Sequence, residues 1–210
     1  MDFMNLNQSA HGDREFGHIV TRMRKNRKVV VGHWQDEKAQ AKIAVWMRVS
    51  AGWADAQDMR IIRFGDQMNN VAVTDGDKVE AEMRLGYHVD YYPIANLVAL
   101  LNEVTDAEVA ELVATYEKEY VIADEQKKNE HFNHQVKEAA KAEIALRRFL
   151  VAKGAKAFTT NFDDLAGIDQ LPGLACQRLM AEGYGFGAEG DWKTAALYRT
   201  MWFMGQGLPK

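Results

Sequence analysis

The turn around Glu189 is the strongest candidate for chemistry in this chain. Residues 184–199 have the sequence YGFGAEGDWKTAALYR, so a glycine-rich turn places one carboxylate between an expected strand and an expected helix. Ligands of open α/β sheets bind beyond the carboxyl ends of the strands. A glutamate there could bind a hard cation such as Mn²⁺ or Mg²⁺, or transfer a proton. The alternative is structural, because an acid also complements the dipole of the helix expected to begin near Asp191.

The same turn has the letters of a dinucleotide-binding fingerprint. Gly185–Gly190 is GFGAEG, which matches Gly-x-Gly-x-x-Gly. That fingerprint belongs after the first strand of a βαβ unit, with an acidic residue about 20 positions further on. Few residues follow the motif here, and Glu189 would place a negative charge beside the pyrophosphate. The match is therefore weak evidence for nucleotide binding.

Two further loops follow expected strands and carry acids. They are residues 64–68 (FGDQM) and 159–164 (TTNFDD). If the sheet is parallel, both loops lie at the same edge as Glu189. Taken singly, Asp66, Asp163 and Asp164 are more typical of turns and helix caps than of catalysis.

Two histidine-containing segments have low functional weight by themselves. Gln8 and His11 pair an amide and an imidazole at helical spacing ahead of an amphipathic helix. His131 and His134 lie three apart in a polar helix, which is not the His-Glu-x-x-His pattern of zinc enzymes. A solvent-exposed face is favoured over metal binding for this second pair.

Short apolar runs alternate with longer helical segments, which is typical of βαβ units. We expect an α/β fold: an open, mostly parallel, doubly wound sheet with helices on both faces, Rossmann-like or flavodoxin-like. The expected strands are Lys28–Gly32, Met59–Phe64, Tyr87–Tyr92, Ala157–Thr160 and Tyr184–Ala188.

Helix boundaries follow from capping signals. A helix is expected from about Asp36 to Ala56, and Thr105 with Glu108 has the form of a capping box at another helix start. The longest helix is expected from about Asp124 to Lys153, ending at Gly154, with a polar N-terminal half that projects into solvent.

Composition excludes several classes of protein. The 210 residues are 47% hydrophobic and 27% charged with a formal net charge of −4, which gives no general attraction to nucleic acid or acidic membranes. The single cysteine, Cys176, excludes an internal disulfide and is expected to be a small buried hydrophobe. No signal peptide or long apolar run is present, so we predict a cytoplasmic protein without nucleic-acid or membrane partners.

Over its whole length the sequence resembles the middle of an L-arabinose isomerase. The resemblance rests on several long strings in order: Asn5–Glu15, Val29–Trp34, Arg63–Asp66, Asn70–Thr74, Val89–Pro93 and Gly183–Leu197. It implies a metal-dependent isomerase that interconverts L-arabinose and L-ribulose, and in many members D-galactose and D-tagatose, usually with Mn²⁺.

The resemblance also implies roles for particular residues. Glu189 matches a glutamate that ligates the metal and transfers the proton between the first two carbons of the sugar. Gln8, His11, Met68 and Phe162 match positions that line the sugar site, several of them from a neighbouring subunit of a trimer paired into a hexamer. Residues 1–58 would then complete an N-terminal α/β domain, and 59–210 would form the central domain.

The matched region ends before the family's second catalytic glutamate and its two metal-binding histidines. Because one carboxylate is a poor Mn²⁺ site, this chain alone is expected to be inactive. The alternative is a non-catalytic module of the same fold that binds sugar or supports assembly.

Overall fold

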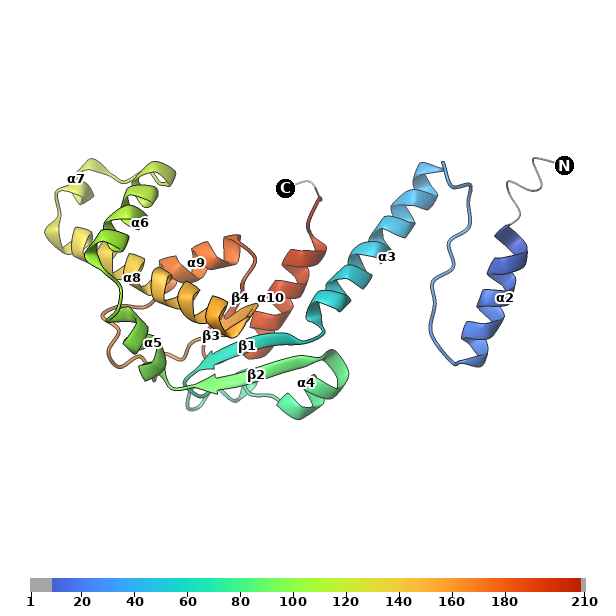
Figure 1. The fold of residues 1–210 in the computed structure, drawn as a ribbon, viewed down its shortest axis with the longest axis horizontal. Helices are drawn as coiled ribbons and strands as arrows, with labels where there is room; N and C mark the ends of the chain where they lie inside the picture. The colour runs from blue at the N-terminus through green and yellow to red at the C-terminus, as the bar shows by residue number, and fades with distance from the viewer. Residues whose placement is uncertain (1–8, 209–210) are drawn as a thin grey trace. The chain divides into compact units, whose positions relative to one another are not determined.

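A computed structural model describes residues 9–208 of the chain, which divides into two compact units that meet between Met47 and Arg48 (Figure 1). The first unit contains helix α2 (Ser9–Arg22) and the beginning of helix α3 (Glu37–Ala56). The first unit also contains the connection between these two helices, and the residues from Arg48 onward belong to the second unit. Within residues 9–208, none of the helices is both long and apolar enough to cross a bilayer.

The strand expected at Lys28–Gly32 is wrong. Residues 25–31 form neither helix nor strand, and Val29 and Val31 are 66% and 85% exposed. A strand needs a neighbour for its backbone N–H and C=O groups. No segment among the described residues pairs with this one, so its β-branched residues alone do not make it a strand.

The second unit is built on four parallel strands. They are β1 (Met59–Phe64), β2 (Tyr87–Tyr92), β3 (Ala157–Thr159) and β4 (Gly185–Gly187), in the order β2-β1-β3-β4. Figure 1 shows β1 and β2 side by side with their carboxyl ends at the same edge. The first two strands have the predicted bounds, β3 and β4 are slightly shorter, and the expected α/β class is confirmed.

Helices cover both faces of the sheet. Ile62, Phe64 and Phe158 belong to a large core cluster, whose other buried members include residues of α5 (Ile94–Leu101), α6 (Asp106–Glu119), α8 (Glu130–Lys153) and α9 (Gly173–Ala181). The alternate residues Met59, Ile61 and Ala157 pack in a smaller cluster with α4 (Lys78–Leu85) and α10 (Trp192–Met204). Burial on both faces explains why four of the six residues of β1 are large apolar side chains.

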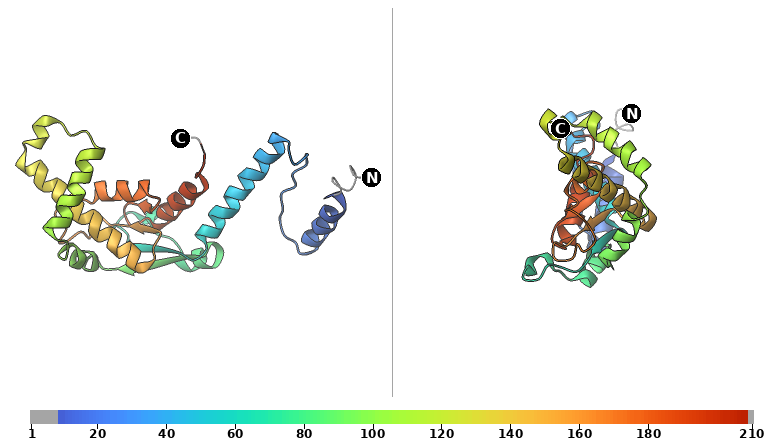
Figure 2. Two further views of the ribbon diagram at one scale, coloured as in Figure 1. Left: turned by 45° about the horizontal axis from the view of Figure 1, so that its top comes forward. Right: turned by 90° about the vertical axis from the view of Figure 1, so that its left-hand side faces the viewer.

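The long helix expected from Asp124 to Lys153 is broken in two. A short helix, α7 (Asp124–Lys127), precedes α8, and Asn129 between them has an extended backbone. The Asn129 side chain accepts a hydrogen bond from the backbone N–H of Phe132 at 3.1 Å, so it caps a new helix. Figure 2 shows α7 and the first turns of α8 lying away from the sheet, as their polar sequence predicts.

Other capping predictions are confirmed. Thr105 and Glu108 form the expected capping box of α6, and the left-handed Gly154 ends α8. A short 3-10 helix, η1 (Ala72–Thr74), lies in the connection between β1 and α4. Cys176 is buried in the core, as predicted, and burial raises the pKa of its thiol to about 12, so the thiol is unreactive.

A buried carboxylate joins three helices. Glu143 of α8 is 1% exposed and accepts hydrogen bonds from Tyr116 Oη of α6 at 2.7 Å and from Arg178 Nε of α9 at 2.8 Å. Arg147 Nη2, one turn further along α8, donates to it at 3.0 Å. A charge buried this deeply is tolerated only because both of its oxygens are satisfied.

Helix α10 lies directly against the backbone of β4. A Cβ atom at Gly185 would overlap the carbonyl oxygen of Ala195, and one at Gly187 would overlap the carbonyl oxygen of Asp191. Only glycine at these two positions allows the helix to approach the strand this closely.

We therefore expect Gly185→Ala to lower the free energy of unfolding by about 3 kcal/mol, because overpacking against backbone cannot be relieved by a rotamer change. Gly173→Ala in α9, where a Cβ meets no atom within 4 Å, is the matched control and should change stability by less than about 1 kcal/mol. Urea unfolding followed by circular dichroism measures both. Equal effects of the two substitutions would contradict the packing described here.

A second prediction concerns Asp55, in the last turn of α3. Its carboxylate accepts hydrogen bonds from Arg199 Nε at 2.8 Å and Lys156 Nζ at 2.9 Å. Burial raises the pKa of Asp55, but the hydrogen bonds and charges of Arg199 and Lys156 outweigh burial and hold the pKa below its ordinary 3.8. A depressed pKa contributes stability above the unfolded-state pKa, and that stability is lost as the pH falls through the folded-state pKa.

Asp55→Asn should therefore cost about 2 kcal/mol of unfolding free energy at pH 7. The difference from wild type should shrink as the pH falls below about 4. Asp58→Asn, at an exposed aspartate nearby, is the control and should shift stability by less than about 0.5 kcal/mol. Urea titrations at a series of pH values test this, and a deficit of Asp55→Asn that is independent of pH would contradict it.

Candidate functional site

Three loops meet at the carboxyl edge of the sheet. They follow β1, β3 and β4 and cover residues 65–71, 160–172 and 188–191. Asn161 Nδ2 donates to the carbonyl oxygen of Asp66 at 2.5 Å, and the Gly190 N–H donates to the carbonyl oxygen of Thr160 at 2.9 Å. The parallel sheet thus brings together the three loops that the sequence placed at one edge.

Two glycines set how closely these loops pack. Gly190 has φ +80°, and a Cβ there would lie 2.8 Å from the Cα of Gln67. Gly65 has φ +74°, and a Cβ there would lie 2.9 Å from Asp164 Oδ2. The loop that carries Glu189 is therefore in backbone contact with the loop that carries Met68.

Glu189 itself has an unusual backbone. Its φ is +63°, in the left-handed region that non-glycine residues seldom occupy. The residue is half-buried, and within residues 9–208 no hydrogen bond or ion pair engages its carboxylate. Such strain costs on the order of 1 kcal/mol and tends to cluster at functional sites. The fold thus fixes the backbone of Glu189, and no group among the described residues occupies its carboxylate.

The neighbouring acids have structural roles. Asp191 accepts hydrogen bonds from Thr194 N–H at 2.9 Å and Thr194 Oγ1 at 2.7 Å, which confirms it as the N-cap of α10. Asp163 Oδ2 accepts from the Asn69 N–H at 3.0 Å, as expected for turn chemistry. Because Asp191 already caps the helix, a capping role does not explain Glu189.

The other predicted site residues fall into two groups. Met68 is half-buried in the loop after β1, and Phe162 is 46% exposed in the loop after β3, so both share the carboxyl edge with Glu189. His11 belongs to the first unit, where its exposed imidazole lies 3.3 Å from Glu15 one turn further along α2. Gln8 lies outside the described residues. The roles assigned to these four residues stay predictions.

Sequence reasoning missed Arg63. This residue is the last but one of β1, on the face of Ile61. It is 4% exposed and has Nη2 2.8 Å from Asp66 Oδ1. Its Nε and Nη2 atoms make no well-directed hydrogen bond, so a buried guanidinium under the loop keeps donors unsatisfied. The available signal was an arginine at a core-facing position of an apolar strand.

Glu189 could offer at most one carboxylate to a metal ion at this edge. An octahedral Mn²⁺ site needs several oxygen or nitrogen ligands. Among residues 9–208, Glu189 belongs to no group of three metal-binding side chains whose ligand atoms come within 4.8 Å of one another. The described residues therefore do not form a complete Mn²⁺ site around Glu189, and the expected Mn²⁺ remains a prediction.

Comparison with known proteins identifies a family for both parts of the chain. Residues 60–207 match the family model of the L-arabinose isomerase central domain, and residues 1–58 match that of the L-arabinose isomerase N-terminal domain.

Curated relatives give the same result. L-arabinose isomerases of Phocaeicola vulgatus and Bacteroides thetaiotaomicron are 69% and 68% identical over the whole chain, and that of Tolumonas auensis is 54% identical. The chain belongs to the L-arabinose isomerase family. It spans 42% of the length of each of these three relatives.

The close approach of Gly190 to Gln67 predicts that the loop after β4 stabilises the loop after β1. Gly190→Ala should separate the two loops and increase hydrogen–deuterium exchange in the peptide covering residues 65–70. Gly207→Ala is the control, because Gly207 has a similar φ of +78° but a Cβ there meets nothing within 4 Å. If exchange at residues 65–70 is the same in both variants, the two loops do not hold each other.

Proposed function

We propose that this chain is part of a metal-dependent aldose–ketose isomerase that converts L-arabinose to L-ribulose, with Glu189 as its proton-transfer residue. The observation that carries the proposal is the Glu189 carboxylate: half-buried, strained and without a partner among the described residues. Membership of the L-arabinose isomerase family supports the choice of reaction.

The chemistry needs one group that takes and returns a proton. A carboxylate removes the proton from C2 of the open-chain aldose, while the C1 carbonyl oxygen gains a proton, giving an ene-diol. The ketose forms when C1 receives the proton held by the carboxyl group and the hydroxyl proton on O2 is released. Because no side chain among the described residues pairs with it, the Glu189 carboxylate is free to contact the substrate or the cofactor.

The remaining site residues are proposed from their positions. Met68 and Phe162 would supply apolar surface beside the sugar, and Gln8 and His11 would reach the site of a neighbouring subunit in a trimer paired into a hexamer. Mn²⁺ is proposed as the cofactor of the intact protein, with Glu189 among its ligands, and D-galactose as a second substrate. Because the chain spans 42% of its relatives, we assign activity to the whole protein and none to this chain alone.

The test is Glu189→Gln in the intact protein supplied with Mn²⁺ and L-arabinose. Removing a general acid–base group should lower kcat by at least about 100-fold, with an unchanged melting temperature. Glu125→Gln, at an exposed glutamate of α7, is the matched control and should keep wild-type turnover. L-ribulose formation is measured, and an active Glu189→Gln enzyme would overturn the proposed role.

A further inference from the structure

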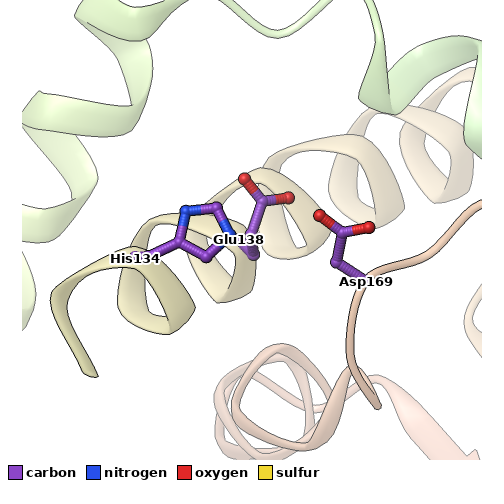
Figure 3. Close-up of side chains that lie close together, drawn as sticks. All are labelled: His134, Glu138 and Asp169. Atoms are coloured by element: carbon purple, nitrogen blue, oxygen red, sulfur yellow. The ribbon is translucent and has the colours of Figure 1, made fainter. Parts of the chain in front are cut away.

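A second group of side chains that could bind a metal lies away from Glu189. Two of its members precede β3 in the sequence and the third follows it. His134 and Glu138 are one turn apart on α8, and Asp169 projects toward them from the loop between β3 and α9 (Figure 3). One ligand atom from each of the three side chains lies within 4.8 Å of the other two. We call these three residues the His134 cluster.

We propose that the His134 cluster is a binding site for a divalent cation of the Zn²⁺ type. One imidazole nitrogen and two carboxylate oxygens are a ligand set that Zn²⁺ accepts, whereas Mg²⁺ and Ca²⁺ prefer oxygen alone. Three protein ligands leave a fourth tetrahedral position for water.

The spacing of the cluster is suited to closing around an ion. Ligands at about 2.0–2.2 Å from Zn²⁺ lie roughly 3.4 Å apart in a tetrahedral site. His134 and Asp169 are exposed, so small rotations of their side chains can close the present spacing without moving the backbone. Glu138 is the fixed member, since its side chain is only 15% exposed.

The surroundings of the His134 cluster leave space for an ion. A hollow of about 180 Å³ is lined by Glu138, Asp169, Lys141 and Gln170, among others, which leaves room for water ligands. Gln170 Nε2 donates to the carbonyl oxygen of Gln135 at 2.6 Å, so the loop is already tied to α8 beside the cluster. The ligands are therefore partly preorganised.

Lys141 lowers the affinity of the His134 cluster for a cation. Its Nζ donates to Glu138 Oε1 at 2.7 Å and neutralises one of the two carboxylates. The second oxygen of Glu138 remains for a cation. Since the ammonium group repels the ion, we infer micromolar affinity, weaker than that of a structural zinc site.

A bound ion would fasten the loop after β3 to α8. That loop also carries Phe162, so the cation would stiffen the connection leading away from the carboxyl edge. Ligands that bind only the folded state raise its melting temperature. Zn²⁺ at about 100 times its Kd should raise the melting temperature by several degrees.

The experiment is calorimetric titration of the metal-free 210-residue chain with ZnCl₂. We expect one equivalent bound with a Kd of about 10 μM or tighter, and at least tenfold weaker binding in both His134→Ala and Asp169→Asn. His131→Ala removes the nearest other histidine of α8, which is exposed and outside the cluster, and should bind like wild type. Glu189→Gln should also bind like wild type, so this result is independent of the isomerase assay.

Two outcomes would overturn the proposal. One is the absence of saturable Zn²⁺ binding by the wild-type chain. The other is equal binding by His134→Ala and His131→Ala, which would mean that Zn²⁺ binds to surface histidines in general. Far-UV circular dichroism identifies unfolded variants, and Asp169→Asn, which keeps the shape of the side chain, provides the answer if His134→Ala fails to fold.

Discussion

The close packing of α10 on β4 is the constraint on which the carboxyl edge depends. Without side chains at Gly185 and Gly187, the strand backbone lies against the first turns of the helix. The connection between them is then only residues 188–191, and such a short turn must include unusual backbone angles. Both Glu189 and Gly190 have positive φ there. The left-handed backbone of Glu189 thus accompanies the close approach of β4 and α10, and their packing fixes where the turn lies.

The acids at this edge differ in whether the fold already supplies hydrogen bonds to their carboxylates. Asp191 caps α10 and Asp163 holds a backbone amide of the neighbouring loop. Each of these carboxylates accepts a hydrogen bond from a backbone N–H group of the fold. Glu189 has no such donor among the described residues, so its charge can interact with whatever enters the edge. Glu189 and Asp191 are both acids and lie two residues apart, but they differ in their hydrogen-bond partners and therefore in what they can do.

Helix α8 combines two environments along one axis. Its C-terminal half is buried against the sheet and holds Glu143, whose hydrogen bonds join α6, α8 and α9. Its N-terminal half carries the exposed His134 and the partly buried Glu138 beside the loop after β3. Fixing the buried half determines where the exposed half points, which is why a surface cluster can be held against a loop from another part of the sequence.

The sequence alone determined the strands β1 and β2, most helix caps and the family. It also identified Glu189 as the strongest candidate for a functional residue. These depend on local signals: alternating burial, cap residues and glycine-flanked turns act within a few positions of the chain. It did not determine that residues 28–32 lack a strand or that Asn129 divides the long helix, because pairing and capping compete with propensity. Nor did it reveal the unsatisfied donors of Arg63 or the approach of Asp169 to His134. Those depend on contacts between segments far apart in sequence, and only the tertiary structure decides which side chains meet there.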